Sequence, residues 1–502
     1  MMPQTLLTVA QFGLSLLLLC LWLLLLAASV HLLRLGLWAL NKPLSVGVRE
    51  APSCPEQDLP LVTVQLPMRN ERFLAARAIR AACALDWPRD RLQIQVLDDS
   101  DEGDETTRVV DAEIMRLANV GFHISVVRRP DRTNFKAGHL DFALPLAVGE
   151  FVAVFDVDFV PPQDFLRRTV PHLLARKKLA FVQARWSFLN ETDSLLTRVQ
   201  ALILHGLFLV EQAYLSAHNQ PVQFNGSGGV FRKAALVEAN GWVGGDGRQA
   251  ASVTEDLDLS YRVRLVGYDL LTMPTLAVPT ELPGSMAAFR NQQKRWVLGN
   301  AQVLRSLLGR ILLPGRSLAE RGAMSLHLLR HVRQPYLALS LLFLPLAPLG
   351  LLHGLMAPPG GLFAAVLVLW VSLSTYYGAA LRRLGRSAIE AVVLSPVVMA
   401  LSMGLCVALS VELLRGVFQN RNTAVFVRTP KTGGQETKSE SYRPVLSKLA
   451  RIEVLAGVAY VGMSLWLFVR GEYLTALGFG ALIGAGLLWV GGPMPATRPG
   501  RS

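Results

Sequence analysis

Long apolar runs stand at both ends of this 502-residue chain, and roughly residues 60–300 between them have the composition of an ordinary globular domain. Leu6–Val30 would form a helix about 37 Å long, enough to cross the apolar part of a bilayer. Hydrophobic residues make up 51% of the chain, an unusual share for a wholly soluble enzyme. Five further apolar segments follow residue 320: Gln334–Met356, Gly361–Leu381, Ala388–Leu414, Ile452–Val469 and Tyr473–Val490. We therefore predict a multi-pass protein of the lipid bilayer that carries one globular domain.

The formal net charge of +13 does not indicate nucleic-acid binding, because no basic stripe is interleaved with aromatic residues in the globular part. Many basic residues instead lie beside apolar segments, where the positive-inside rule explains them: Arg305, Arg310, Arg316, Arg321, Arg330 and Arg333. No Lys or Arg precedes the first apolar run, which argues against a signal peptide. Arg34, Lys42 and Arg49 follow that run and predict a cytoplasmic C-terminal end for it. The four cysteines form no CxxC pair, so no disulfide framework or structural zinc site is expected.

Two basic stretches conflict with a simple count of spans. Arg382–Arg386 and residues 415–451 should both be cytoplasmic, yet one apolar segment, Ala388–Leu414, separates them. Pro396 interrupts that segment. One explanation is that this segment enters the bilayer and returns to the same face, or lies partly in the interface. The other is that one of the two basic clusters does not indicate a cytoplasmic position. We favour the first explanation, which leaves five or six spans open.

The globular part alternates strand-like and helical patterns. Runs rich in β-branched and aromatic residues predict strands at Leu61–Leu66, Leu92–Leu97, His123–Val127, Phe151–Phe155 and Ala180–Ala184. Helical patterns lie between them at Arg72–Leu85, Glu105–Leu117 and Lys136–Leu146. This alternation predicts an α/β domain with a mostly parallel sheet covered on both faces, and such sheets bind ligands at the carboxyl ends of their strands.

Acidic pairs fall at two of these strand ends. Asp156 and Asp158 follow Phe151–Phe155, where both carboxylates can approach a divalent cation held by a diphosphate. Such a cation would neutralise a diphosphate leaving group. Asp98 and Asp99 follow Leu92–Leu97 and suit the hydroxyl groups of a nucleotide. Solvated loop charges are the alternative explanation of both pairs.

A third acidic group, Thr254-Glu255-Asp256, precedes an amphipathic run at Leu257–Val266. Ser252 and Glu255 also form a capping-box pattern, so helix initiation alone is an alternative. A carboxylate in a first helical turn lies near the positive end of the helix dipole and stays ionised, available as a general base. Inverting sugar transfer needs one such base and no nucleophilic carboxylate.

Three further stretches carry candidate binding residues. Lys136 begins a helical pattern and could meet a phosphate or an acidic neighbour, or could be a surface charge. Gln292–Trp296 offers a guanidinium for phosphate oxygens and an indole ring for sugar stacking, although an amphipathic interfacial helix would carry the same residues. Phe224–Gly229 lacks the spacing of known phosphate-binding loops, and we interpret it as a tight turn near an acceptor.

Taken in order, these motifs resemble the processive branch of glycosyltransferase family 2: Asp98-Asp99, Asp156-x-Asp158, Thr254-Glu255-Asp256 and Gln292-x-x-Arg295-Trp296. The resemblance covers roughly residues 60–435 and looks closest to cellulose-synthase-like A and C enzymes, mannan and glucan synthases, and their bacterial relatives. Phe224–Gly229, Glu281-Leu282-Pro283 and Phe426–Lys431 carry the closer likeness. It implies a GT-A (Rossmann-like) cytosolic domain at residues 55–305. This domain would lie between a transmembrane helix in residues 1–40 and interface and transmembrane helices in residues 306–502.

The resemblance also implies a role for each candidate residue. Contacts to the nucleotide-sugar donor are implied for Asp98, Asp99, Lys136, Asp156, Gln292 and Arg295. Asp158, together with Asp156, would hold Mg²⁺ or Mn²⁺. Asp256 would be the general base, with Glu255 beside it. Acceptor contacts are implied for Trp296, Phe224, Asn225 and Gly226, and a gating-like loop at residues 424–434 would close over the nucleotide with Phe426, Thr429 and Lys431.

The expected activity is inverting, metal-dependent transfer of a hexose from a donor of the UDP-glucose or GDP-mannose type to a growing β-linked polysaccharide, which a membrane channel would export. Transfer of one sugar to a membrane lipid is the alternative, and a non-catalytic transporter is a distant third. The catalytic domain is expected in the cytoplasm, at a bacterial inner membrane. The motifs encode neither the donor sugar nor the oligomeric state.

Overall fold

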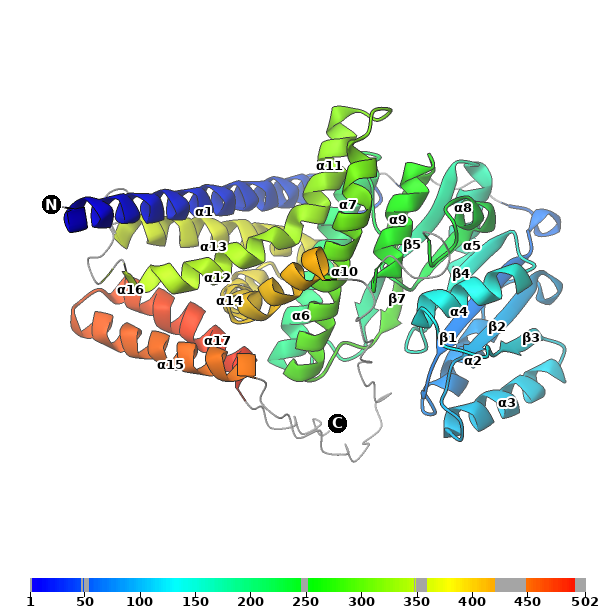
Figure 1. Ribbon diagram of the computed structural model, residues 1–502. Coiled ribbons are helices and arrows are strands. Elements are labelled where there is room, and N and C mark those ends of the chain that lie inside the picture. The colour runs from blue at the N-terminus through cyan, green and yellow to red at the C-terminus, as the bar shows by residue number, and fades with distance from the viewer. Residues whose placement is uncertain are drawn as a thin grey trace.

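A seven-stranded sheet with its covering helices forms one end of the molecule, and long apolar helices run away from it at the other end (Figure 1). The computed structural model describes residues 2–46, 48, 54–244, 252–346, 348, 359–419 and 448–492. The predicted arrangement, an α/β domain flanked by apolar helices, is confirmed.

The strands follow the order β3-β2-β1-β4-β6-β5-β7 across the sheet. Their bounds are β1 Val62–Met68, β2 Leu92–Asp98, β3 His123–Val127, β4 Phe151–Val154, β5 Leu179–Phe188, β6 Gly229–Arg232 and β7 Asp269–Thr280. Strand β6 runs antiparallel to both neighbours, and the other pairs are parallel. The mostly parallel sheet is therefore confirmed, whereas the sequence analysis did not predict β6 or β7.

The two faces of the sheet carry separate apolar cores. Phe151 and Ala153 of β4 join the core on one face, and Val152 and Val154 join the core on the other, as the alternation of side chains along a strand requires. The helices of this domain are α2 Ala75–Cys83, α3 Glu105–Ala118, α4 Phe135–Ala143, α5 Phe165–Ala175, α8 Lys233–Glu238 and α9 Glu255–Leu265, with short turns η1 Glu56–Asp58, η2 Arg89–Arg91 and η3 Leu144–Leu146.

A long apolar helical stretch between β5 and β6 joins the domain to the other helices. It consists of α6 Leu195–Gly206, the π-helical turn η4 Leu207–Glu211 and α7 Gln212–Ala217. Apolar residues of this stretch share one core with α1 Met2–Leu40 and with the helices that follow the sheet. This stretch was not predicted from the sequence.

The remaining helices follow the sheet in the sequence. They are α10 Met286–Leu312, α11 Leu318–Leu329, η5 Arg330–Val332, α12 Arg333–Phe343, η6 Leu344–Leu346, α13 Pro359–Arg383, α14 Ile389–Phe418, α15 Lys448–Val469, α16 Tyr473–Leu477, η8 Gly478–Gly484 and α17 Ala485–Gly491. Helix α10 crosses between the sheet and the long helices α1, α12, α13 and α15 (Figure 1).

Six helices in the described residues are long and apolar enough to cross a membrane: Leu23–Leu40, Leu195–Ala217, Ala364–Arg383, Ile389–Phe418, Lys448–Val469 and Tyr473–Gly491. The predicted segments overlap five of these, and Leu195–Ala217 was not predicted. The predicted segment Gln334–Met356 is described as helical through Leu346, and its residues 349–356 lie outside the described part.

Both ends of α14 contact the side of the molecule that carries the sheet. Near its start, Glu390 pairs with Arg198 of α6 at 3.1 Å. Near its end, Glu412 pairs with Lys294 of α10, also at 3.1 Å. A helix that crosses a bilayer brings its two ends to opposite faces. The contacts of α14 therefore favour the explanation in which Ala388–Leu414 lies along the interface.

We expect Gly404→Ala to destabilise the packing of α14 against α17. A Cβ atom at Gly404 would lie 2.2 Å from the carbonyl oxygen of Gly486, so the two helices must separate, at a cost of about 1–3 kcal/mol. The measurement is the midpoint of thermal unfolding in detergent. Gly462→Ala in α15 is the matched control, because a Cβ there has nothing within 4 Å. Equal midpoints for the two variants would contradict the close contact.

Candidate active site

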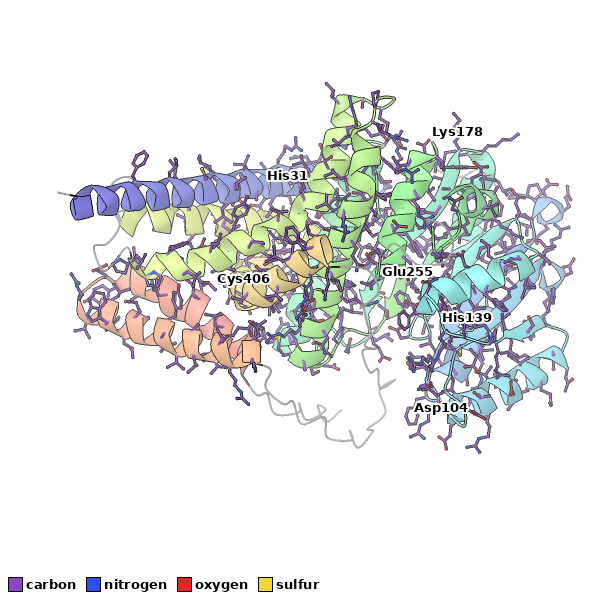
Figure 2. The ribbon with its side chains drawn as sticks, in the orientation of Figure 1. His31, Asp104, His139, Lys178, Glu255 and Cys406 are labelled. Atoms are coloured by element: carbon purple, nitrogen blue, oxygen red, sulfur yellow. The ribbon has the colours of Figure 1, made fainter. Side chains whose placement is uncertain are left out.

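The predicted acidic motifs lie at the carboxyl ends of β2 and β4 and in the first turn of α9. Figure 2 shows Glu255 at the junction between the sheet and the long helices, with Cys406 inside the helical part and Asp104 at the lower edge of the α/β domain. Glu255, and with it the adjacent Asp256, therefore lies where the two parts of the molecule meet.

Lys136, on α4, connects three segments that are distant in the sequence. Its Nζ lies 2.5 Å from Oδ1 of Asp156 and donates a hydrogen bond to the carbonyl oxygen of Gly226 at 2.7 Å. Burial opposes the charge on Lys136, but the nearby carboxylates of Asp156, Glu255 and Asp256 outweigh it and raise the pKa of the ammonium group. The side chain meets an acidic neighbour, one of the predicted alternatives, and is not a free surface charge.

Asp256 is the second residue of α9, in the first turn as predicted, but the expectation that the helix dipole keeps its carboxylate ionised is wrong. Burial, and then the charge of Glu255, raise the pKa of Asp256 to about 7, although a hydrogen bond from the Leu257 amide and the cations Lys136 and Arg295 oppose this shift. A carboxyl group with a pKa near neutrality is suited to proton transfer. The capping box is not formed, because Thr254 is the N-cap residue and makes no side-chain cap bond.

The turn before β6 lies directly against these carboxylates. Gly226 has a φ of +86°, and a Cβ atom there would lie 3.1 Å from Oδ2 of Asp256. Ser227 Oγ accepts a hydrogen bond from the amide of Asp156 at 2.8 Å. The turn therefore provides a wall of backbone and small side chains beside Asp156 and Asp256, and glycine satisfies both the backbone angle and the close approach.

Phe224, at the start of this turn, faces away from the site. Its side chain is completely buried in the apolar core beneath the sheet, where its ring packs edge-on against Phe231 and lies close to Trp242. It has no exposed surface with which to contact an acceptor. We therefore correct the predicted acceptor contact of Phe224, and the role that remains for it is to hold the turn.

The two carboxylates after β4 have different surroundings. Asp158 is buried, and Thr280 at the end of β7 donates a hydrogen bond to its Oδ2 at 2.5 Å. Asp156 keeps 33% of its side-chain surface exposed. Within the described residues, no group of three or more His, Cys, Asp or Glu side chains forms a metal site.

The carboxylates after β2 are held by basic residues that the sequence analysis missed. Nε and Nη2 of Arg129 donate to Asp99 at 2.9 and 2.6 Å, and Nδ1 of His139 lies 3.1 Å from Asp99 Oδ1. Burial opposes ionisation of Asp99, but the hydrogen bonds from His139 and Arg129 outweigh it and lower the pKa of Asp99. Asp98 is buried and accepts a hydrogen bond from Nε of Arg128 at 3.1 Å.

Helix α10 brings the predicted motif Gln292–Trp296 to the same region. Ser252 Oγ donates to the carbonyl oxygen of Gly299 at 2.9 Å, so the segment before α9 is bonded to α10. Arg295 lies close enough to lower the pKa of Asp256. Trp296 packs against a small apolar cluster, and Gln292 is half-buried one turn earlier. The gating-like residues Phe426, Thr429 and Lys431 lie outside the described residues.

Comparison with known protein families indicates which family the domain that carries this site resembles. Residues 63–235 match Glycosyl transferase family 2, and residues 151–381 match Glycosyl transferase family group 2. Together the two matches span residues 63–381, so this part of the chain carries glycosyltransferase family 2 domains. Its mixed seven-stranded sheet, with apolar helices on both sides in the sequence, agrees with the predicted GT-A architecture of that family.

The family 2 domain is similar to curated plant enzymes. Glucomannan 4-beta-mannosyltransferase 2 and 9 of Arabidopsis thaliana are each 42% identical, over 258 and 257 residues, which cover 51% and 50% of this chain and 47% of each relative. Probable glucomannan 4-beta-mannosyltransferase 6 of Oryza sativa subsp. japonica is 37% identical over 289 residues, 57% of this chain and 49% of the relative. The aligned region thus spans about half the length of these relatives.

Among solved structures, mannosyltransferase PcManGT from Pyrobaculum calidifontis, in complex with GDP-Man and Mn²⁺, is 21% identical with a TM-score of 0.49. The match covers 72% of this chain and 96% of that chain.

Proposed function

We propose that this family 2 enzyme transfers a hexose, with inversion, from a nucleotide sugar to a growing β-linked polysaccharide. The observation that carries the proposal is the gathering of Asp256, Lys136 and Asp156 around Gly226 within a family 2 domain. The names of the plant relatives favour a mannosyl donor over a glucosyl donor. GDP-mannose is therefore the donor that we propose first, and UDP-glucose second.

In the proposed reaction, the carboxylate of Asp256 takes the proton of an acceptor hydroxyl group. The acceptor oxygen then bonds to the anomeric carbon, and the bond from that carbon to the diphosphate oxygen breaks. Lys136 and Arg295 are the cations beside Asp256, and we propose that they bind diphosphate oxygens as negative charge develops there. A single base is sufficient, because attack on the face opposite the leaving group inverts the anomeric centre.

We propose that Asp156 and Asp158 hold Mg²⁺ or Mn²⁺ together with the donor. Magnesium is commonly bound by one or two carboxylates plus substrate phosphates, and the partly exposed carboxylate of Asp156 fits that requirement. Asp158 is less accessible, and its Oδ2 already accepts from Thr280. A bound cation would neutralise the diphosphate leaving group.

The proposed binding surfaces follow from the same geometry. Asp98 and Asp99 would recognise the nucleoside, with Arg128 and Arg129 setting the orientation of their carboxylates, and Gln292 would contribute to the donor site. Trp296, Asn225 and Gly226 would bind the acceptor end. We also propose that residues 424–434 act as a gating-like loop that closes over the bound nucleotide.

We propose a multi-pass protein of a bacterial inner membrane, with the family 2 domain in the cytoplasm. The contacts of Glu390 and Glu412 keep both ends of α14 beside that domain. Of the six apolar segments predicted from the sequence, five would then remain as spans. They correspond to α1, a segment beginning with α12, α13, α15 and the continuous stretch from α16 to α17. This arrangement places the basic residues on both sides of α14 in the cytoplasm. We also propose that these spans form the channel for export.

The decisive experiment supplies the full chain in proteoliposomes with radiolabelled GDP-mannose or UDP-glucose, with and without Mg²⁺ or Mn²⁺. We expect label from GDP-mannose in polymer of high molecular weight, with a divalent cation required. Label extracted with lipid would instead support transfer of a single sugar. No incorporation of label from any common donor would contradict the proposed enzymatic activity. It would favour the remaining alternative, a non-catalytic transporter.

A further inference from the structure

A chain of hydrogen bonds links α9, which carries Asp256, to the segment between α11 and α12. The hydroxyl group of Tyr261 on α9 lies 2.6 Å from Nδ1 of His327 on α11. Nη1 of Arg330, the first residue of η5, lies 3.0 Å from Nε2 of the same imidazole. The two ring nitrogens of His327 thus join Tyr261 to Arg330.

The same guanidinium also reaches the turn that contains Gly226. Nη2 of Arg330 donates to Oε1 of Gln223 at 3.2 Å. Nε2 of Gln223 donates to Oδ1 of Asn225 at 2.8 Å, and Asn225 is followed directly by Gly226. Arg330 is therefore linked to α9 through His327 and Tyr261, and to the Gly226 turn through Gln223.

The donors and acceptors of this chain agree with one another. Burial, and then the charge of Arg330, lower the pKa of His327 well below its usual value, so the imidazole is neutral. Its Nε2 can then accept from Arg330 while its Nδ1–H donates to Tyr261, whose own hydroxyl donates to the carbonyl oxygen of Met324 at 3.2 Å. Because each of its ring nitrogens has a hydrogen-bond partner, the neutral imidazole of His327 is held in one orientation.

We propose that Arg330 is a positioning residue for sugar transfer: it sets the separation between the base Asp256 and the Gly226 turn. The proposal rests on the function proposed above. Arg330 touches neither the donor nor the acceptor in this scheme and acts through Tyr261 and Gln223. Misplacement of a reacting group by about 1 Å can cost 10²-fold in rate. A small loosening of the hydrogen-bonded chain from Tyr261 to Gln223 therefore affects catalysis. Arg330 begins η5, which directly precedes α12, so this hydrogen-bonded chain also joins the site to the membrane-directed helices.

Arg330→Gln is expected to lower kcat about tenfold and to leave the donor KM within about twofold, because the base is displaced while the nucleotide site is intact. Arg321→Gln is the matched control: it removes the same charge from α11, where the guanidinium donates to the carbonyl oxygen of Leu312. Arg330→Lys keeps the charge but replaces the planar fork, whose two nitrogens each meet one acceptor, by a single nitrogen on a shorter side chain. We expect this variant to stay impaired. Gln223→Ala combined with Arg330→Gln is expected to be no slower than the worse single variant.

Hydrogen exchange gives a readout that does not require activity. We expect faster exchange at residues 224–229 and 255–260 in Arg330→Gln than in Arg321→Gln. Equal exchange and equal kcat in these two variants, or full activity of Arg330→Lys, would overturn the proposal. If Arg330→Gln does not fold, Gln223→Ala replaces it in both measurements. A wild-type protein that transfers no sugar would refute the proposed function. The exchange data would still decide whether Arg330 restrains residues 224–229 and 255–260.

Discussion

Asp256→Asn is expected to lower the rate of sugar transfer about 10³-fold while nucleotide binding stays within about twofold of wild type. The amide has the shape of the carboxylate and can still accept the hydrogen bond that the Leu257 amide donates to Oδ1 at 2.8 Å. It cannot take a proton from an acceptor hydroxyl group. The measurements are the initial rate of radiolabel transfer from GDP-mannose and the affinity for GDP, both on the full chain.

Glu255→Gln is the matched control for this substitution. It removes a carboxylate from the same helical turn without removing the proposed base, so its effect on the rate should be much smaller. Because the charge of Glu255 raises the pKa of Asp256, the variant should also ionise Asp256 at a lower pH. Equal losses of transfer and of GDP binding in Asp256→Asn would contradict its role as the base, since they would indicate a damaged donor site.

The site residues that sequence reasoning located are those with a local signal. The acidic residues after β2 and β4 stand where a buried strand ends, and Asp256 stands where an amphipathic helix begins. Each position follows from a pattern within about ten residues of sequence. The positive charges around Ala388–Leu414 were also informative, because they suggested the placement that the ion pairs of Glu390 and Glu412 now favour.

The partners of these residues could not be located in this way, because only the fold brings them close. Arg129 and His139 follow Asp99 by 30 and 40 residues and reach it because β3 pairs with β2 and α4 packs beside them. Arg330 meets Gln223 across 107 residues. The error at Phe224 has a related cause: the sequence places this residue in the turn, but only the packing of β6 shows that its ring belongs to the core.

Lys136→Met is expected to lower kcat at neutral pH by about 10²- to 10³-fold. The substitution keeps most of the side-chain length but removes the cation that pairs with Asp156 and bonds to the Gly226 carbonyl oxygen. It therefore removes a group proposed to bind the leaving diphosphate. It also removes one of the two cations that hold down the pKa of Asp256, so that this pKa should rise above its present value of about 7.

The pH dependence separates these two effects. Only ionised Asp256 accepts a proton, so the wild-type rate should rise as the pH increases through about 7. In Lys136→Met the rise should move to higher pH, and the difference from wild type should be smaller at about pH 9 than at about pH 7. Lys178→Met is the control, because Lys178 is exposed at the edge of the α/β domain (Figure 2). A loss of rate that is uniform across the pH range would show that Lys136 acts on the diphosphate alone and does not control the ionisation of Asp256.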